Sequence, residues 1–188
     1  MRPRYGVESI VLARAPVAEA SAILFLLTPD FGLVRARAQG VRRPGAKLAA
    51  ATQTLSECDA ILLRGKETWR LSGALPVRNR FTELSQEARA RAGRIARLLL
   101  RLVQGETNDP TLFRSYQSFL NALTNLPNDA GEYAECLAAL HLLRALGLDA
   151  GTLPEGSDTY TPSALEAIRN DRRTYILRVN RGIAASGL

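Results

Sequence analysis

The stretch AILFLLTPDFGLVRARA, residues 22–38, decides the fold. It begins with a nearly all-apolar run that ends at Thr28, which predicts a buried strand. Pro29 fixes φ and Gly32 permits positive φ, so the segment between them predicts a turn. After the turn, arginine alternates with Val and Ala, which predicts a half-buried strand with Arg35 and Arg37 on its outer face. The stretch therefore predicts two adjacent strands, the second of them basic on the outside.

Working outward from this pair, three more segments have the composition of short strands. They are rich in apolar and β-branched residues and cover residues 7–12, 55–63 and 68–75. Arg64-Gly65-Lys66 joins the last two, as expected of a hairpin turn. Five short strands within about 75 residues predict a small barrel or sandwich.

After Asn79 the apolar period changes from 2 to 3.6, which predicts helices. Thr82 is the expected N-cap of the first helix, Asp109-Pro110 opens the second, and Gly147 ends the third. The fold class is therefore predicted to be α+β, with a barrel over residues 1–80 and an all-helical domain over 81–188. The helices are expected at about 82–104, 110–125 and 129–147, followed by a shortened C-terminal segment with a short helix from Thr161-Pro162.

The excess of positive over negative charge lies entirely in the predicted barrel. Residues 1–80 carry 13 Lys and Arg against 6 Asp and Glu, so the net charge of +7 for the whole chain comes from this part. Residues 81–188 are neutral. A basic β-module indicates a polyanion as partner, and the high pI favours nucleic acid or an anionic membrane.

The sharpest local motif is GVRRPGAK, residues 40–47, a glycine-bounded loop that follows the basic strand. Guanidinium and ammonium groups on such a loop match phosphate oxygens, although a solvated charged loop is the alternative. The hairpin before Trp69 is a second candidate, in which Trp69 either contacts a base or packs in the core. The candidate nucleic-acid-binding residues are Arg35, Arg37, Arg42, Arg43, Lys47, Arg64 and Lys66.

No combination of residues indicates catalysis, so the chain is not expected to be an enzyme. His141, the only histidine, lies among leucines and is expected to be a core residue. Cys58 and Cys136 are far apart in the sequence, in no metal-binding spacing, and are expected to be reduced. No metal or cofactor is expected. With no apparent signal peptide or membrane span, a cytoplasmic protein is expected.

Four arginines, Arg91, Arg94, Arg97 and Arg101, surround the apolar face of the first predicted helix. They are interpreted either as its solvated face or as an extension of the basic surface of the barrel.

Taken together, these residues resemble the bacterial recombination mediator family RecO from about Tyr5 to Gly147. The resemblance rests on the order and spacing of several short stretches, and it is weaker in the helical region, which includes Leu142–Gly147. The stretches are Glu8–Leu12, Glu19, Ile23–Pro29, Gly32–Val34, Gly40–Pro44 with Lys47, and Arg64-Gly65.

The resemblance implies an N-terminal OB-fold and a helical domain. It also implies binding of single- and double-stranded DNA, annealing of complementary strands, and work with RecR and the acidic C-terminal tail of single-stranded-DNA-binding protein to load RecA. Many members bind zinc through four cysteines after the three helices, but residues 150–158 contain no cysteine, so no zinc is carried over.

Two other functions fit the residues. The first is a protein-interaction adaptor that docks the acidic tail, with incidental DNA binding. The second is an RNA-binding OB module, since a barrel that binds phosphates distinguishes RNA from DNA only through further contacts.

Overall fold

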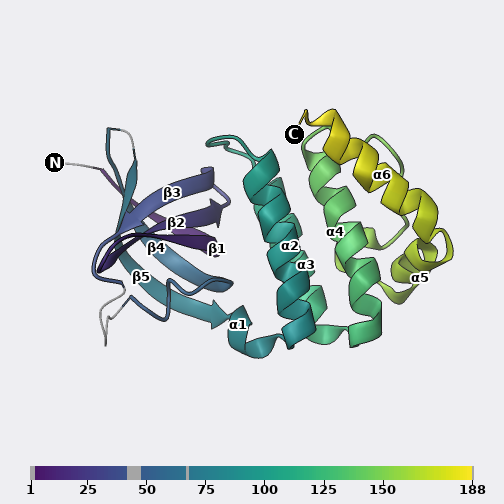
Figure 1. Ribbon diagram of the computed structural model, residues 1–188, viewed down its shortest axis with the longest axis horizontal. Helices are drawn as coiled ribbons and strands as arrows, with labels where there is room; N and C mark the ends of the chain where they lie inside the picture. The colour runs from purple at the N-terminus through teal and green to yellow at the C-terminus, as the bar shows by residue number, and fades with distance from the viewer. Residues whose placement is uncertain (1–2, 42–47, 67, 188) are drawn as a thin grey trace. The chain divides into compact units, whose positions relative to one another are not determined.

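The computed structural model describes residues 3–41, 48–66 and 68–187 (Figure 1). The chain forms two compact units. The first consists of residues 1–83 together with 103–113, and the second of residues 84–102 together with 114–188. The first is built around strands and the second is helical, so the fold class is α+β as expected.

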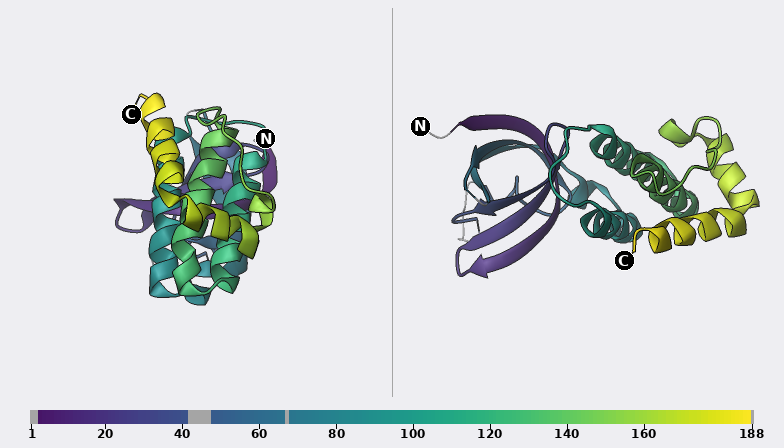
Figure 2. Two further views of the ribbon diagram at one scale, coloured as in Figure 1. Left: turned by 90° about the vertical axis from the view of Figure 1, so that its right-hand side faces the viewer. Right: turned by 90° about the horizontal axis from the view of Figure 1, so that it is seen from above.

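The first unit contains a closed five-stranded barrel with the strand order β1-β2-β3-β5-β4, whose curvature is visible in Figure 2. All neighbouring strands are antiparallel except β3 and β5, which pair in parallel over three residue pairs. This order and closure define an OB-type barrel. The strands are β1 (Arg4–Ala18), β2 (Ser21–Thr28), β3 (Gly32–Ala38), β4 (Ser56–Arg64) and β5 (Trp69–Asn79).

Strict alternation on β3 separates the core of the barrel from its outer surface. Val34, Ala36 and Ala38 are fully buried, whereas Arg35 and Arg37 are exposed. Leu24 and Leu26 on the neighbouring strand β2 are buried in the same cluster. Burial of such aliphatic side chains contributes about 1.5–3 kcal/mol each, so the alternation fixes which face of β3 points inward.

At the junction of β5 with the short helix α1 (Arg80–Glu83), a buried ion pair anchors the chain. The guanidinium of Arg80 is 1% exposed and donates from Nε to Oε1 of Glu57 on β4 at 2.5 Å. The backbone N–H of Arg80 also donates to the carbonyl of Leu55, which has a φ of 67°. The side chain and backbone of one residue thus hold the end of β5 against the start of β4.

The predicted strands are present, but two extend further than expected. β1 begins before and ends after residues 7–12, and β5 continues through Pro76 to Asn79. The expected N-cap of the first long helix was wrong. The Thr82 hydroxyl donates to the carbonyl of Asn79, and Ser85 caps α2 by accepting from the N–H of Ala88. Separate short and long helices therefore replace a single helix beginning at residue 82.

Among the residues that the structure describes, the second unit contains α-helices and two short 3-10 helices, with α4 packed against α2, α5 and α6. Leu137, Leu140 and Leu143 of α4 are fully buried. The Tyr116 hydroxyl on α3 donates to the carbonyl of Ala92 on α2 at 3.0 Å. The helices are α2 (Gln86–Leu102), α3 (Thr111–Asn125), α4 (Gly131–Ala145), α5 (Pro162–Asn170) and α6 (Arg172–Ala185). The last of these was not anticipated as a helix of its own.

His141 on α4 is largely buried, as expected, beside the left-handed residue Tyr160. Its Nε2 atom and the hydroxyl of Tyr160 are buried without a hydrogen-bond partner in the described part of the chain. Desolvation lowers the pKa of His141, although a backbone hydrogen bond at Ser157 and the charge of Asp158 oppose this. The neutral imidazole is therefore the form that fits the folded protein.

Within the described residues, no helix has the length and apolar character needed to cross a bilayer.

We expect Arg80→Met to destabilise the barrel by about 3 kcal/mol or more, because it leaves the Glu57 carboxylate buried without its partner. The matched control is Arg78→Met, which removes the more exposed ion pair with Glu83 and should cost less than about 1 kcal/mol. Urea unfolding followed by the fluorescence of Trp69, the only tryptophan, reports on this unit. Equal losses in the two variants would contradict the role given to Arg80.

We expect the helical unit to lose stability as the pH falls below about 6.5. The folded-state pKa of His141 is lowered, so the unfolded chain takes up the proton more readily and the stabilisation present above that pH is lost below it. Urea unfolding followed by far-UV circular dichroism at about pH 7.5 and about pH 5.5 measures this difference. His141→Gln should reduce it, and an unchanged pH dependence in that variant would show that other groups are responsible.

Candidate nucleic-acid interface

The outward side of β2, β3 and β5 carries three arginines, one of which lies over an aromatic ring. Arg35 lies opposite Phe25 in the β2–β3 register, and its guanidinium is 5.4 Å from the centre of that ring. Arg37 and Arg70 are partners in the parallel pairing of β3 with β5. We call these four residues, Phe25, Arg35, Arg37 and Arg70, the outer basic face.

The cations of this face are not neutralised within the described part of the chain. No ion pair there joins Arg35, Arg37 or Arg70 to a carboxylate, and all three side chains are exposed. Arg70 makes a long contact of 3.5 Å with the side chain of Gln39. Adjacent like charges on neighbouring strands disfavour folding unless an anion is bound between them. The geometry thus suits a phosphate backbone lying across β3 and β5.

The β4–β5 hairpin brings two further candidates to the barrel surface. Lys66 is exposed at the turn, and the side chain of Arg64 is 54% exposed while forming an ion pair with Glu106. In OB-folds the β2–β3 face and the β4–β5 loop are the usual places where oligonucleotides bind. Arg42, Arg43 and Lys47, the candidates on the 40–47 loop, lie outside the described residues.

Trp69 is placed in the core of the barrel rather than on its surface. It is 4% exposed and packs against Tyr5 and Phe31, with ring centroids 5.4 and 5.1 Å away. Its indole N–H donates to Oε1 of Glu106 at 2.7 Å. Of the two interpretations of Trp69, base contact or core packing, the structure agrees with core packing.

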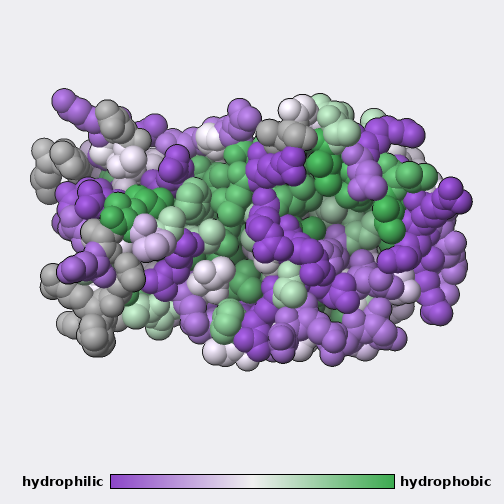
Figure 3. All heavy atoms as spheres, viewed as in Figure 1, coloured by the Kyte–Doolittle hydropathy of each residue, from purple (hydrophilic) through white to green (hydrophobic). Residues whose placement is uncertain are grey.

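The helical unit contains a pocket of about 360 Å³ between α2, α4, α5 and α6. Ile95, Leu98 and Ile176 are among its apolar lining residues. On the face shown in Figure 3, hydrophobic residues gather over these helices next to strongly hydrophilic ones.

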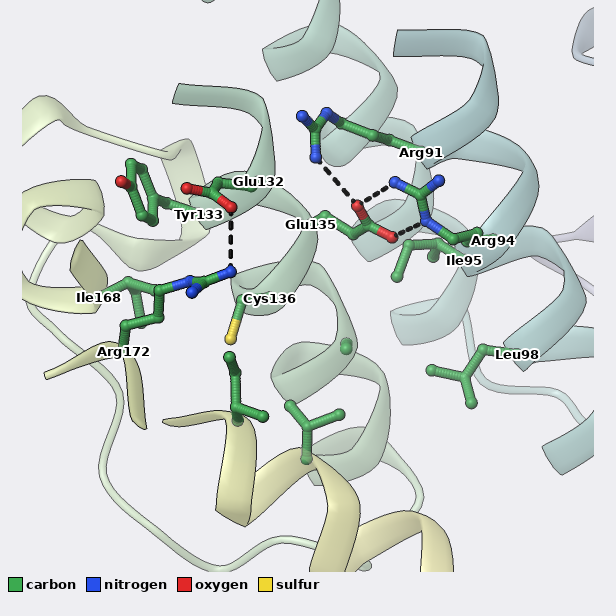
Figure 4. A pocket seen from close by; sticks show the side chains of 13 residues that line it. Arg91, Arg94, Ile95, Leu98, Glu132, Tyr133, Glu135, Cys136, Ile168 and Arg172 are labelled. Atoms are coloured by element: carbon green, nitrogen blue, oxygen red, sulfur yellow. Dashed lines mark hydrogen bonds and ion pairs between the residues drawn. The ribbon is translucent and has the colours of Figure 1, made fainter. Parts of the chain in front are cut away.

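Arginines and carboxylates line one side of this pocket. Arg91 and Arg94 both point at the carboxylate of Glu135, and Arg172 points at Glu132 (Figure 4). Arg97 and Arg101, the other two arginines of α2 considered above, are exposed. The four therefore divide between paired and solvated positions.

Cys136 lies in the pocket, and burial raises the pKa of its thiol to about 11. Cys58 is buried in the barrel, where desolvation also raises its pKa. Both are free thiols, as expected. Across the described residues, no three or more His, Cys, Asp or Glu side chains are grouped to hold a metal ion.

Sequence reasoning missed Phe25, Arg70 and Glu106. The alternation of buried Trp69 with exposed Arg70 could have indicated the second, and the position of Phe25 opposite Arg35 follows once the hairpin register is known. The position of Glu106 follows from no local pattern, since it contacts a residue 37 positions away.

The strand order and the outer basic face define an OB-type barrel with a cationic surface. A family model described as "Recombination protein O N terminal" matches residues 1–80. Over these residues the chain is similar to the RecO family.

Several curated proteins with the name "DNA repair protein RecO" are similar to this chain. The protein from Heliobacterium modesticaldum is 32% identical over 145 residues, which cover 76% of this chain and 51% of that protein. One from Dehalococcoides mccartyi is 29% identical over 123 residues, which cover 64% of this chain and 48% of that protein. One from Synechococcus elongatus is 39% identical over 71 residues, which cover 38% of this chain and 27% of that protein. In the longer of these matches, the chain spans about half the length of its relative.

Proposed function

We propose that this protein is a DNA repair and recombination mediator that acts by binding, without a catalytic step. It binds single- and double-stranded DNA, anneals complementary strands and, together with RecR, helps to load the recombinase. The observation that carries the proposal is the outer basic face, whose three arginines have no carboxylate partner among the described residues. The name shared by the relatives, DNA repair protein RecO, agrees with it.

Annealing requires two polyanions to approach each other, and the barrel can reduce the electrostatic cost. Arg35, Arg37 and Arg70 would neutralise phosphates of a bound strand and release its counterions. Phe25 offers a ring beside these cations, on which a base can stack without sequence preference. The proposal also assigns phosphate binding to Arg42, Arg43 and Lys47, which follow β3 in the sequence, and to Arg64 and Lys66 of the hairpin.

A second candidate function is that of an adaptor for the acidic C-terminal tail of single-stranded-DNA-binding protein. The pocket of the helical unit favours it, because apolar walls and an arginine-bearing side suit an acidic peptide that ends in an aromatic residue. Carboxylates of the peptide would replace Glu135 as the partner of Arg91 and Arg94. They would likewise replace Glu132 as the partner of Arg172.

We expect the double variant Arg35→Ala/Arg37→Ala to bind labelled single-stranded DNA more weakly than the wild type, regardless of sequence. Losing two phosphate contacts should also reduce the slope of log affinity against log salt by about 1.4. Fluorescence anisotropy across about 50–200 mM salt measures both effects. The control, Arg169→Ala/Arg173→Ala, removes the same charge from exposed positions of the helical unit. Equal effects of the two double variants would refute the assignment of the outer basic face, and an RNA oligonucleotide bound more tightly than DNA would favour the RNA module.

For the pocket, we expect Ile176→Asp to weaken binding of an acidic peptide ending in phenylalanine by about tenfold or more, a loss of about 1.4 kcal/mol. The new carboxylate would stand in the apolar wall and repel the peptide. Leu177→Asp is the matched control, because Leu177 is the next residue of α6 but does not line the pocket. Isothermal titration calorimetry compares them, and similar affinities of the two variants would exclude this pocket as the peptide site.

A further inference from the structure

A segment that follows α2 in the chain returns to the barrel. Residues 103–113, which we call the strap, belong to the barrel unit. Glu106 forms an isolated antiparallel bridge with Gly32, and the N–H of Thr107 donates to the carbonyl of Phe31 at 3.2 Å. The strap therefore lies along the β2–β3 turn.

Glycine at position 32 is required for this close approach. Gly32 has a φ of 62°, and a Cβ atom built there would lie 2.6 Å from Cγ2 and 3.0 Å from the backbone nitrogen of Thr107. Any larger residue would push the strap outward and would also be strained in the left-handed region. The turn is thus shaped to receive the strap as well as to reverse the chain.

The strap forms hydrogen bonds with two residues of an aromatic cluster, which consists of Tyr5, Phe31 and Trp69. Their centroids are 5.1–5.4 Å apart, and the pairs that include Tyr5 are edge-to-face. Three rings from the first strand, the β2–β3 turn and the fifth strand meet at this point. Such a cluster offers stacking surface for a nucleobase wherever it becomes accessible.

The strap places one carboxylate against this cluster. Glu106 accepts from the indole N–H of Trp69 at 2.7 Å through Oε1, and from Nη2 of Arg64 at 3.1 Å through Oε2. The guanidinium carbon of Arg64 lies 5.1 Å from the centre of the Trp69 ring. Two donors and an aromatic ring thus surround a single anion.

A phosphodiester binds to the same kinds of hydrogen-bond donor as this carboxylate. Both present negatively charged oxygens that accept charge-assisted hydrogen bonds, and an arginine fork serves either of them. Glu106 and Arg64 are partly exposed, at 39% and 54% of their side chains, so a ligand in solution can reach the pair. The contact lies beside the β4–β5 loop, where OB-folds commonly bind oligonucleotides.

We propose that Arg64 and the indole N–H of Trp69 form a phosphate-binding site for nucleic acid that the Glu106 carboxylate occupies in the free protein. Binding exchanges one anion for another, and displacement of the strap uncovers the aromatic rings for a base. Glu106 is then an internal competitor that lowers the apparent affinity for nucleic acid. This inference rests on the proposed nucleic-acid binding and adds a second, regulated contact to it.

The test compares Glu106→Gln with Glu8→Gln. Both variants raise the net charge of the barrel unit by one, but Glu8 is exposed on β1, away from the strap in the sequence and in the strand pairing. Glutamine at 106 keeps an oxygen acceptor for the indole N–H but no longer neutralises Arg64. We expect Glu106→Gln to bind single-stranded DNA about three- to tenfold more tightly than Glu8→Gln at the same salt, measured by anisotropy.

Two further measurements separate the site from a general charge effect. Adding Arg64→Gln to Glu106→Gln should remove the gain, because the donor for the phosphate is lost. In the wild type, saturating DNA should quench the emission of Trp69, the only tryptophan. Circular dichroism of each variant checks that it is folded.

Equal affinities of Glu106→Gln and Glu8→Gln would overturn this inference, and so would a gain that persists without Arg64. In either case, tight binding by the wild type would leave the outer basic face as the DNA-binding surface. If the wild type and both single variants fail to bind DNA, the proposed function itself fails and this site falls with it.

Discussion

The buried ion pair between Arg80 and Glu57 is the constraint on which the barrel unit depends. It joins the first residue of α1, directly after β5, to the start of β4, and the Arg80 backbone N–H adds a hydrogen bond to the carbonyl of Leu55. Because side chains alternate along a strand, a slip of one residue between these strands would exchange the inner and outer faces. At the other end of the same two strands, the pairing of Arg64 with Trp69 and of Leu63 with Arg70 leaves Trp69 inside and Arg70 outside. Neither group of the ion pair can be buried without the other, so register and charge compensation are a single requirement.

The alternation of side chains along the strands also sets the two barrel surfaces for which a function is proposed. These are the outer basic face and the site formed by Arg64 and Trp69. The alternation that buries Val34 and Ala36 turns Arg35 and Arg37 outward, so the core and the cationic face come from one pattern. The start of β5 adds Arg70 to one face and Trp69 to the other side of the same strand. Packing and electrostatics are therefore not independent in this barrel: a substitution that changes the core also moves the cations.

Local patterns predicted the parts of this structure that depend on local physics. The β2–β3 pair was predicted because Pro29 and Gly32 mark the turn and the alternation of β3 is regular, and Thr161 was expected at the start of α5, where it caps the helix. The extension of β5 past Pro76 was missed, because proline usually argues against a strand and pairing with β4 overrides that preference. Ser85 rather than Thr82 caps α2, a choice that depends on where α1 ends. Glu106 was beyond local reasoning, since its position depends on the chain returning to Trp69 after a long helix.

The position of the strap in the chain has a consequence for the order in which the protein is made. During synthesis all five strands precede residue 103, so a complete set of strands leaves the ribosome before the segment that pairs with Gly32 of the barrel. Until Glu106 emerges, Trp69 and Arg64 have no carboxylate from the strap. The barrel is therefore finished only after α2 has been translated, and its last contact forms by a long-range closure rather than by a neighbouring hairpin.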